Sequence, residues 1–170
     1  MNKVFRLVLM ICTLSVLLCS TCFAFEKVQM NDTLDVRSVH NAYNHNMSNA
    51  GKYTLMADNF RYIGPRDDYE IYASLLTDSN IIEYICNKAG YVDCVVIVSN
   101  NVQTNFDESS MILSILTNGY NETYIDGVVH QSVDGLKSCN IYCKIPDRAY
   151  NVYTTSHNQF LTTVISAFIE

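Results

Sequence analysis

In this chain of 170 residues the clearest structural signal is the stretch Val92-Asp93-Cys94-Val95-Val96-Ile97-Val98. β-Branched residues occupy most of its positions, and such side chains favour an extended backbone. A short, almost wholly apolar run is typical of a strand that lies inside a protein. We therefore predict a buried strand over 92–98 and interpret the rest of the chain outward from it.

The segments on either side of this strand are predicted to be helices. Upstream, an apolar stripe occupies Ile81–Gly90, with a capping residue at Asp78 or Ser79 and a glycine that can end the helix. Downstream, Asn105–Gly119 begins with an asparagine three residues ahead of a glutamate, the pattern of a capping box, and continues with apolar residues at helical spacing. Further upstream, Tyr69–Leu76 is rich in apolar residues and fits either a strand or a helix.

The last part of the chain is predicted to form an antiparallel meander. Asp134-Gly135 is a strong hairpin turn between two strand-like runs, and His157-Asn158-Gln159 has the composition of a second turn. The final run, Phe160–Phe168, fits a strand or a short helix. The three strands before it are expected at Thr123–Val133, Leu136–Ile145 and Tyr150–Thr155.

Helices that are segregated from a run of strands indicate an α+β domain rather than a doubly wound sheet. We expect a single domain over residues 53–170, with an antiparallel sheet and two or three helices packed on it. Residues 25–52 form a poorly defined N-terminal segment. Even spacing of apolar residues from Val28 to Val36 permits a strand, and the polar, asparagine-rich stretch His40–Asn49 is interpreted as a loop.

Residues 1–24 have the composition of a secretory signal peptide. Asn2–Arg6 is short and positive, and Leu7–Leu18 contains no charged residue. Cys22 and Ala24 then place small residues at the −3 and −1 positions of a cleavage site. We expect cleavage after Ala24 and a secreted or periplasmic protein. The alternative is an uncleaved membrane anchor, because the apolar character continues through Phe25.

The charge balance is acidic, with 11 Lys and Arg against 17 Asp and Glu and a formal net charge of −6. Cleavage would remove Lys3 and Arg6 and no acid, so the mature chain would be more acidic still. Such a chain lacks the basic face that neutralises phosphates, which argues against nucleic acid and anionic membrane surfaces as partners. Membrane attachment is expected only if the signal segment is retained.

Four cysteines follow the predicted cleavage site: Cys86, Cys94, Cys139 and Cys143. An even number of cysteines in an exported chain suggests disulfides. Cys139 and Cys143 are expected on one face of one strand, about 13 Å apart, which is too far for a bridge between them. Each of them would then pair with Cys86 or Cys94. Buried, reduced thiols are an equal alternative, and the spacing fits no zinc-binding pattern.

The order of the segments from Tyr53 to Phe168 resembles small exported bacterial proteins related to the PsbP-like α/β sandwich. The resemblance rests on order and pattern, without a diagnostic motif. It implies a binding or assembly module and brings no active site with it. The matching segments are the expected helix Ile81–Gly90, the strand Tyr91–Ser99, the acid-capped helix Asn105–Gly119 and the turn Val133-Asp134-Gly135.

No catalytic, metal-binding or phosphate-binding motif stands out. His40 and His45 are expected in a polar loop, at a spacing that makes no helical metal pair. His130 is expected on a surface strand, two residues from Ser132 and without a partner acid. The glycines form no phosphate-binding loop and the acids no calcium loop. We therefore expect no cofactor and favour a protein that is not an enzyme. The catalytic alternative is a small secreted hydrolase with a site assembled from scattered Asp, His and Ser side chains.

The candidate interaction face is a charged turn between aromatic residues. Phe60–Ile63 is predicted to be a short strand that ends at the turn pair Gly64-Pro65. Arg66-Asp67-Asp68 follows, between Tyr62 and Tyr69, and exposed loops of this kind often carry interactions. We therefore predict an exported, non-catalytic binding or assembly module whose partner is another protein or a component of the cell envelope. A third hypothesis is a structural surface protein held to the membrane by an uncleaved signal.

Overall fold

The Val92–Val98 stretch forms the strand that its sequence predicts, β4 (Val92–Ser99), and this strand lies at the centre of the sheet. The computed structural model describes residues 35–51, 60–77, 80–119, 121–143 and 148–168. These residues form a single α+β domain with one seven-stranded antiparallel sheet and three helices, so the predicted fold class is confirmed. The other elements are α2 (Val36–Asn49), β1 (Phe60–Arg66), β2 (Tyr69–Thr77), β3 (Asn80–Asn87), α3 (Val102–Leu116), α4 (Glu122–Gly135), β5 (Ser138–Cys143), β6 (Arg148–His157) and β7 (Phe160–Phe168).

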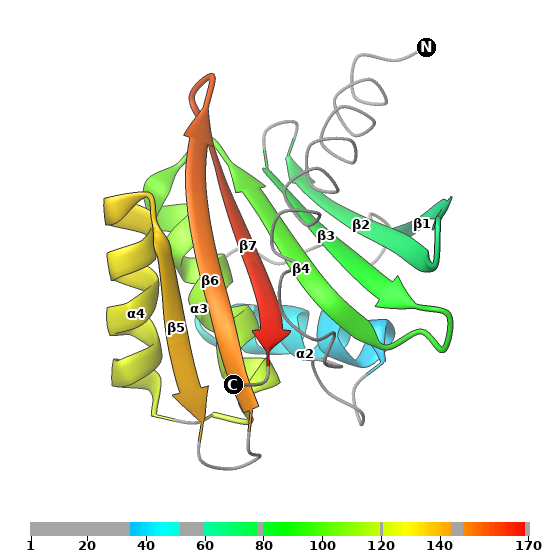
Figure 1. Ribbon diagram of the computed structural model, residues 1–170, viewed down its shortest axis with the longest axis horizontal. Coiled ribbons are helices and arrows are strands. Elements are labelled where there is room, and N and C mark those ends of the chain that lie inside the picture. The colour runs from blue at the N-terminus through cyan, green and yellow to red at the C-terminus, as the bar shows by residue number, and fades with distance from the viewer. Residues whose placement is uncertain (1–34, 52–59, 78–79, 120, 144–147, 169–170) are drawn as a thin grey trace.

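The strand order in the sheet is β1-β2-β3-β4-β7-β6-β5, and all neighbouring strands are antiparallel. β1 to β4 follow one another as hairpins. α3 and α4 then carry the chain to the far edge of the sheet, where β5 begins, and β6 and β7 return toward the centre (Figure 1). β7 pairs with β4, with Val164 opposite Val96. The two halves of the chain therefore meet in the middle of the sheet.

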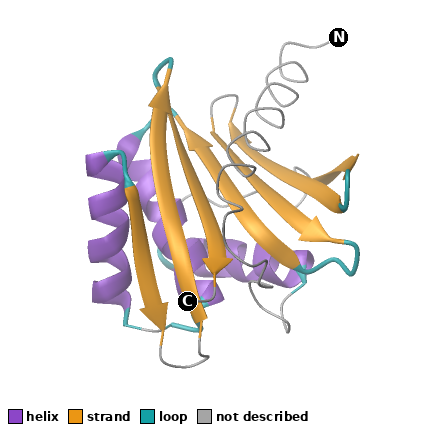
Figure 2. Ribbon diagram, viewed as in Figure 1, coloured by secondary structure: helices purple, strands orange, loops and turns teal. Residues whose placement is uncertain are grey.

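All three helices lie against one face of the sheet (Figures 1 and 2). The main hydrophobic core fills the space between these two layers, and Tyr43, Ile97 and Ile112 are among its largest fully buried side chains. Because successive strand residues point to opposite faces, a second group of side chains is turned away from the helices. The buried members of this second cluster are Ile71, Ile85, Cys94, Val96, Val98 and Val164.

The helix predicted over Ile81–Gly90 is wrong, because this segment forms β3 and the turn into β4. β3 lies between β2 and β4, and its residues from Asn80 to Cys86 are all buried. A strand that is buried on both faces loses the alternation of polar and apolar residues that identifies a strand in a sequence. Its continuous apolar run can then be mistaken for the stripe of a helix.

The strand predicted over Thr123–Val133 is also wrong, because this segment belongs to α4. Asn121 caps the helix, and its side-chain oxygen accepts from the Tyr124 N–H at 3.1 Å. Asp134-Gly135, predicted to be a hairpin turn, is the end of the helix, and the left-handed residue Leu136 follows it. The buried residues of α4 have the spacing of one helical face, and they are Ile125, Val128, Val129, Ser132 and Val133.

His40–Asn49, predicted to be a loop, is part of α2. Asp35 caps this helix: its Oδ1 accepts from the N–H groups of Arg37 and Ser38, at 2.8 and 3.0 Å. The asparagines lie outside the buried stripe and conceal it in the sequence. That stripe recurs every three or four residues and consists of Val36, Val39, His40, Tyr43 and Met47.

Two local predictions also need correction. Gly64-Pro65 does not end β1 but lies within it, at an irregularity where the register shifts between Tyr62 and Gly64. The chain reverses instead at Asp67-Asp68, where the charged turn was expected. The helix over Asn105–Gly119 exists, but Asn101 rather than Asn105 is its N-cap.

Several further predictions are confirmed. Tyr69–Leu76 lies in a strand, strands cover most of Leu136–Ile145 and Tyr150–Thr155, and Phe160–Phe168 takes the strand form of its two alternatives. The turn at Asn158-Gln159 joins β6 to β7. The predicted signal segment, the strand-like spacing before Leu34 and the ordered stretch expected from Tyr53 lie outside the described residues.

Candidate functional site

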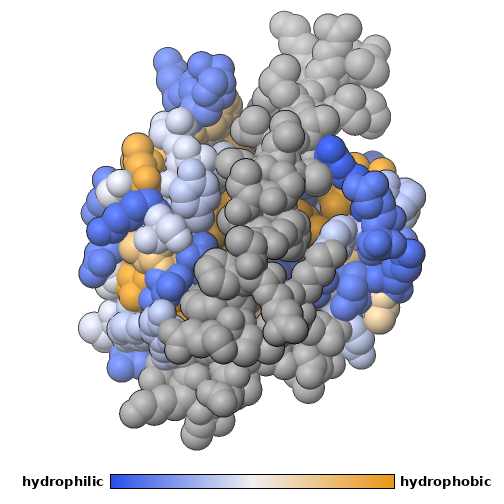
Figure 3. All heavy atoms as spheres, viewed as in Figure 1, coloured by the Kyte–Doolittle hydropathy of each residue, from blue (hydrophilic) through white to orange (hydrophobic). Residues whose placement is uncertain are grey.

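The predicted interaction face is an exposed hairpin at the β1 edge of the sheet. Asp67 and Asp68 form its tip, and Asp68 accepts a salt bridge from Lys88 Nζ at 3.0 Å. The side chains of Lys88 and Asp68 are both well exposed, and salt bridges at the surface contribute little to stability. Arg66 lies opposite Tyr69 in the β1–β2 pair and is half-buried. In Figure 3 the edge of the molecule on this side is largely hydrophilic.

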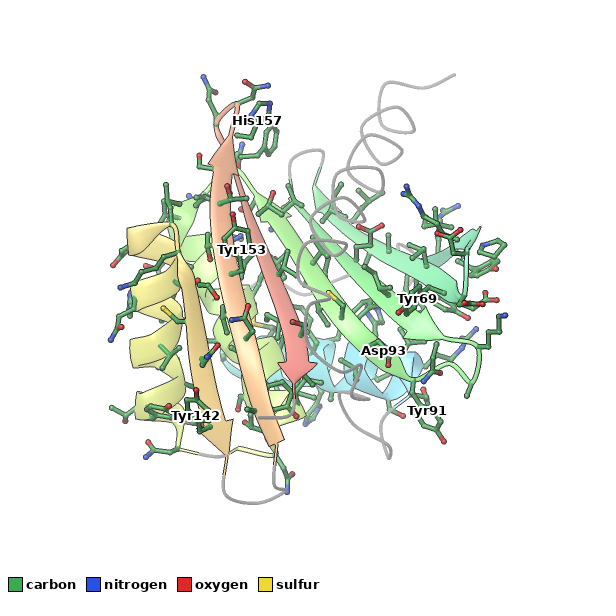
Figure 4. The ribbon with its side chains drawn as sticks, viewed as in Figure 1. Tyr69, Tyr91, Asp93, Tyr142, Tyr153 and His157 are labelled. Atoms are coloured by element: carbon green, nitrogen blue, oxygen red, sulfur yellow. The ribbon has the colours of Figure 1, made fainter. Side chains whose placement is uncertain are left out.

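Tyr62 and Tyr69 do not share one surface. Tyr62 packs against Tyr72 with ring centroids 5.2 Å apart and is 50% exposed. A hydrogen bond to Glu70 raises its pKa to about 12. Tyr69 is half-buried against the second cluster, on the opposite face of the sheet, which is the face turned to the viewer in Figure 4. The two aromatic residues therefore flank the turn from opposite sides.

Cys86 and Cys94 lie on the neighbouring strands β3 and β4 but on opposite faces of the sheet, and both are remote from β5. Cys86 faces the helices and Cys94 faces away from them, and both are free thiols, as is Cys139. β7 and β6 separate β4 from β5, which carries Cys139 and Cys143. At the usual strand spacing these two strands are roughly 14 Å apart, beyond the reach of a disulfide. The predicted bridges are not formed in this arrangement, and the Cys143 side chain lies outside the described part. Burial raises the pKa of Cys86 to about 12, so its thiol is inert.

Neither His130 with Ser132 nor His40 is part of a catalytic arrangement in the described residues. His130 is on a helix, stacked on Phe106, with its Nδ1 3.8 Å from Asp134 Oδ2 at the surface. Ser132 points instead into the core, where its hydroxyl contacts the Lys137 carbonyl oxygen at 2.7 Å. His40 is buried in α2 and stacks on a phenylalanine, and burial lowers its pKa. The described side chains also contain no cluster of three or more His, Cys, Asp or Glu suited to a metal ion.

A groove of about 570 Å³ lies where the three helices meet. The C-terminal end of α2 forms one wall, the first turns of α4 form the other, and α3 runs between them. The α3 residues in the groove are half-buried and flank the fully buried side of the helix, and two of them, Phe106 and Met111, also pack against the core. The lining residues are Asn46, Asn49, Ala50, Phe106, Asp107, Ser110, Met111, Ser114, Glu122, Ile125 and Asp126.

The groove is acidic with apolar contact points. Asp107, Glu122 and Asp126 contribute carboxylates, and none of the described lining residues is Lys, Arg or His. Phe106 and Met111 supply apolar surface between the acids. Such a lining attracts a cationic group and also offers a site for the apolar part of its side chain. The sequence gives no direct signal for this site, because its residues come from three separate helices.

A buried polar group, named here the Glu108 cluster, lies beneath the groove wall and consists of Glu108, Asn80, Tyr43 and Tyr84. All four side chains are nearly or fully inaccessible to solvent. Asn80 Nδ2 donates to Glu108 Oε1 at 2.9 Å. The Tyr43 hydroxyl lies beside the same carboxyl group without meeting strict hydrogen-bond geometry. Burial is the main reason that the pKa of Glu108 rises to about 8.

A second buried network links α3 to α4 through the sheet. Thr163 Oγ1 donates to Asn105 Oδ1 at 2.6 Å and contacts Thr154 Oγ1 at 3.0 Å. Thr154 Oγ1 in turn contacts Ser132 Oγ at 2.9 Å. These four side chains are fully buried, and each has partners inside the core. The network therefore ties α3 and α4 to the same two strands, β7 and β6.

Comparisons with protein-family models, with curated protein sequences and with solved structures found no match. Among the described residues, no helix has both the length and the apolar character needed to cross a bilayer.

Proposed function

We propose that this protein is a non-catalytic binding module that holds a basic segment of a partner protein in the groove between α2, α3 and α4. The observation that carries the proposal is the acidic and apolar lining of that groove. Lysine and arginine side chains combine an apolar stem with a cationic head, and this combination matches carboxylates set among Phe106 and Met111. The acidic net charge of the whole chain would also speed the approach of a basic partner.

Two further considerations support a binding role. Within the described residues the pair His130–Asp134 is at the surface, with its nitrogen and oxygen atoms 3.8 Å apart, and the nearby Ser132 hydroxyl is directed into the core instead. The resemblance to PsbP-like proteins also implies binding or assembly. Two of the segments that match those proteins in order, Ile81–Gly90 and Val133-Asp134-Gly135, form a strand and the end of a helix in this chain.

The binding proposal can be tested with peptides of defined charge. We would titrate the ¹⁵N-labelled protein with an Arg- and Lys-rich decapeptide containing two Leu residues, and with a matched Glu-rich decapeptide. We expect saturable amide shifts confined to the groove for the basic peptide and none for the acidic one. The variant Asp126→Lys should weaken binding by up to about fivefold through the loss of an exposed ion pair, which contributes up to about 1 kcal/mol, and repulsion by the new lysine adds to that loss.

The matched control is Asp134→Lys, which makes the same charge change on the same helix outside the groove. If Asp126→Lys and Asp134→Lys weaken binding equally, the attraction is a property of the net charge and the groove is not the site. If neither peptide produces saturable shifts, the proposed ligand class is wrong.

We also infer that the chain is exported, as the signal-like composition of residues 1–24 suggests. The intact mass of the protein recovered from its native host tests this inference. A mass lacking residues 1–24 would support export with cleavage after Ala24. A mass that includes them would favour the anchored alternative, and fractionation with the membranes would then be expected.

A further inference from the structure

The Glu108 cluster connects the core to one wall of the groove. α2 contributes Asn46 and Asn49 to that wall, and the same helix places Tyr43 beside the Glu108 carboxyl group. α3 carries Glu108 on its buried side and Asp107 on the groove side. A change in the contact between Tyr43 and Glu108 is therefore transmitted directly to the position of the wall.

The hydrogen bonding of this cluster depends on the protonation of Glu108. Within the described residues, Glu108 Oε2 and the hydroxyl groups of Tyr43 and Tyr84 are buried without a hydrogen-bond partner. A neutral carboxyl group supplies one O–H donor and places no charge in the core. An ionised one places a full charge there, with the Asn80 amide as its single well-formed hydrogen-bond donor. Burial beneath α2 favours the neutral acid, and it outweighs the Asn80 and Tyr43 side chains, which favour the ionised form.

Glu108 is the group of this cluster that titrates near neutral pH. Burial lowers the pKa of His40, raises the pKa of Tyr43 and Tyr84 far above their usual values, and raises that of Cys86 to about 12. All four are therefore uncharged between pH 7 and 9. Asp107, the nearest acid on the same helix, raises the pKa of Glu108 further.

Of the other elements packed on α3, β6 adds one titratable group, the buried Tyr150 hydroxyl, which donates to the Leu116 carbonyl at 3.0 Å, about two helical turns from Glu108. The helix-facing residues of β4 and β7 and the buried residues of α4 are all aliphatic or hydroxyl-bearing. They are Val92, Val95, Ile97 and Ser99 on β4, Leu161, Thr163, Ile165 and Ala167 on β7, and Ile125, Val128, Val129, Ser132 and Val133 on α4.

α2 is attached in a way that permits such a movement. Its N-terminal end is fixed to the β3–β4 turn. The Val36 N–H donates to the Gly90 carbonyl at 3.1 Å, and the backbones of Asp35 and Tyr91 form an isolated antiparallel β-bridge. Its principal helical neighbour among the described elements is α3. Separation of the C-terminal half of α2 from α3 would then be a swing about this fixed N-terminus that draws the buried side chains of Tyr43 and Met47 out of the core.

We propose that Glu108 is a proton-operated latch: when protonated it holds α2 against α3 and β3, and when it loses its proton the C-terminal half of α2 moves away and the groove loses a wall. The latch itself follows from the cluster, and only its effect on ligand binding rests on the proposed function of the groove.

The direction of the pH effect follows from linkage. The closed state holds Glu108 at a pKa of about 8, and opening to water returns it toward its ordinary value of 4.5. The closed state then binds the proton more tightly, so the ratio of open to closed molecules rises about tenfold for each pH unit between those two values. The latch is strongest below pH 4.5 and weakest above pH 8.

Hydrogen exchange of the full chain tests the latch without any ligand. Amide protection would be measured at pH 6.0 and pH 8.5 for residues 36–49 in α2 and 122–135 in α4, and corrected for intrinsic rates. In the wild type we expect α2 protection to fall on the order of a hundredfold between these pH values, while α4 protection stays constant. Glu108→Gln, a neutral isostere, should give α2 the same protection at both pH values.

Glu108→Leu serves as a second neutral variant if the glutamine variant folds poorly, and it should also remove the pH dependence. The latch is wrong if the wild type and the neutral variants show the same pH dependence, or if α2 and α4 lose protection together. Binding of the basic decapeptide at both pH values separates the two proposals. If exchange follows the expectation but no peptide binds at either pH, the latch stands and the proposed ligand is wrong.

Discussion

Asn80 at the start of β3 donates a 2.9 Å hydrogen bond to Glu108 in the middle of α3, inside the core and across 28 positions of sequence. Among the described residues it is the single well-formed hydrogen bond of this inaccessible carboxyl group. A buried acceptor that loses its donor keeps its desolvation cost without the compensating bond. The Asn80–Glu108 pair therefore ties the start of β3 to α3 more firmly than a hydrogen bond between exposed side chains would.

We predict that Asn80→Ala lowers the free energy of unfolding by about 1–3 kcal/mol, measured by urea denaturation at pH 6. The substitution should also raise the pKa of Glu108 further, because the Asn80 amide now stabilises the ionised form. Asn140→Ala, at an exposed position of β5, is the control and should stay within about 0.5 kcal/mol of the wild type. An Asn80→Ala variant as stable as that control would contradict the importance assigned to this bond.

The chain of hydroxyls between α3 and α4 gives a second prediction. Thr163→Val keeps the shape of the side chain and removes the donor to Asn105 and the contact to Thr154. We expect a loss of about 1–3 kcal/mol in unfolding free energy, because Asn105 Oδ1 is left buried without this donor. Thr155→Val, on the opposite face of β6, should have little effect.

A double-mutant cycle would establish that the two threonines act as one network. Thr154→Val and Thr163→Val remove two ends of the same 3.0 Å contact. Their combined effect should differ from the sum of the single effects by more than about 0.5 kcal/mol. Strict additivity would show that the two hydroxyls are satisfied independently.

The sequence predicts this fold where local pattern and tertiary environment agree. Val92–Val98 is correctly placed because a β-branched run has few alternatives to a strand. The prediction for residues 81–86 fails because this strand is buried on both faces, so that neither the periodicity of a helix nor that of a half-buried strand remains in the sequence. In α4 the helical spacing of Ile125, Val128 and Val129 is present in the sequence, but β-branched composition and the Asp134-Gly135 pair favour a hairpin. In that case the tertiary packing overrides propensity.

The candidate site was beyond prediction for a different reason. Glu108 is recognisable in the sequence only as a possible capping residue, yet it points into the core, because Asn101 caps the helix. Its partners Asn80 and Tyr43 come from segments that local patterns assigned to a helix cap region and a loop. The groove likewise depends on three helices, two of which were predicted to be a loop and a strand.

Gly127 in the middle of α4 offers a stabilising substitution. It is exposed, takes a helical backbone, and has open space where a Cβ would lie. Gly127→Ala should therefore raise the free energy of unfolding by about 0.5–1 kcal/mol, because alanine loses less backbone entropy in a helix. Gly90→Ala is the contrasting variant, since Gly90 has φ of +85°, which an alanine rarely adopts. Thermal unfolding should move in opposite directions for the two, and a shared direction would count against this explanation.

The N-cap of α2 provides a prediction with a defined pH dependence. The N–H of Ser38 holds the pKa of Asp35 below its ordinary value, with further help from the Ser38 hydroxyl and the Arg37 N–H. The stabilisation by this carboxylate is therefore complete above the ordinary value of 3.8 and is lost as the pH falls through the lowered value in the folded protein.

Asp35→Ala should cost about 1 kcal/mol of unfolding free energy at pH 7, and the difference from the wild type should shrink below pH 3.8. Asp35→Asn, which keeps a capping oxygen without the charge, should lie between the two at pH 7. Urea unfolding at pH 7 and pH 2.5 measures both effects. If the alanine variant differs from the wild type by the same amount at the two pH values, the cap acts through the shape of the side chain alone. α2, the wall of the groove and the moving part of the proposed latch, would then be anchored independently of charge at Asp35.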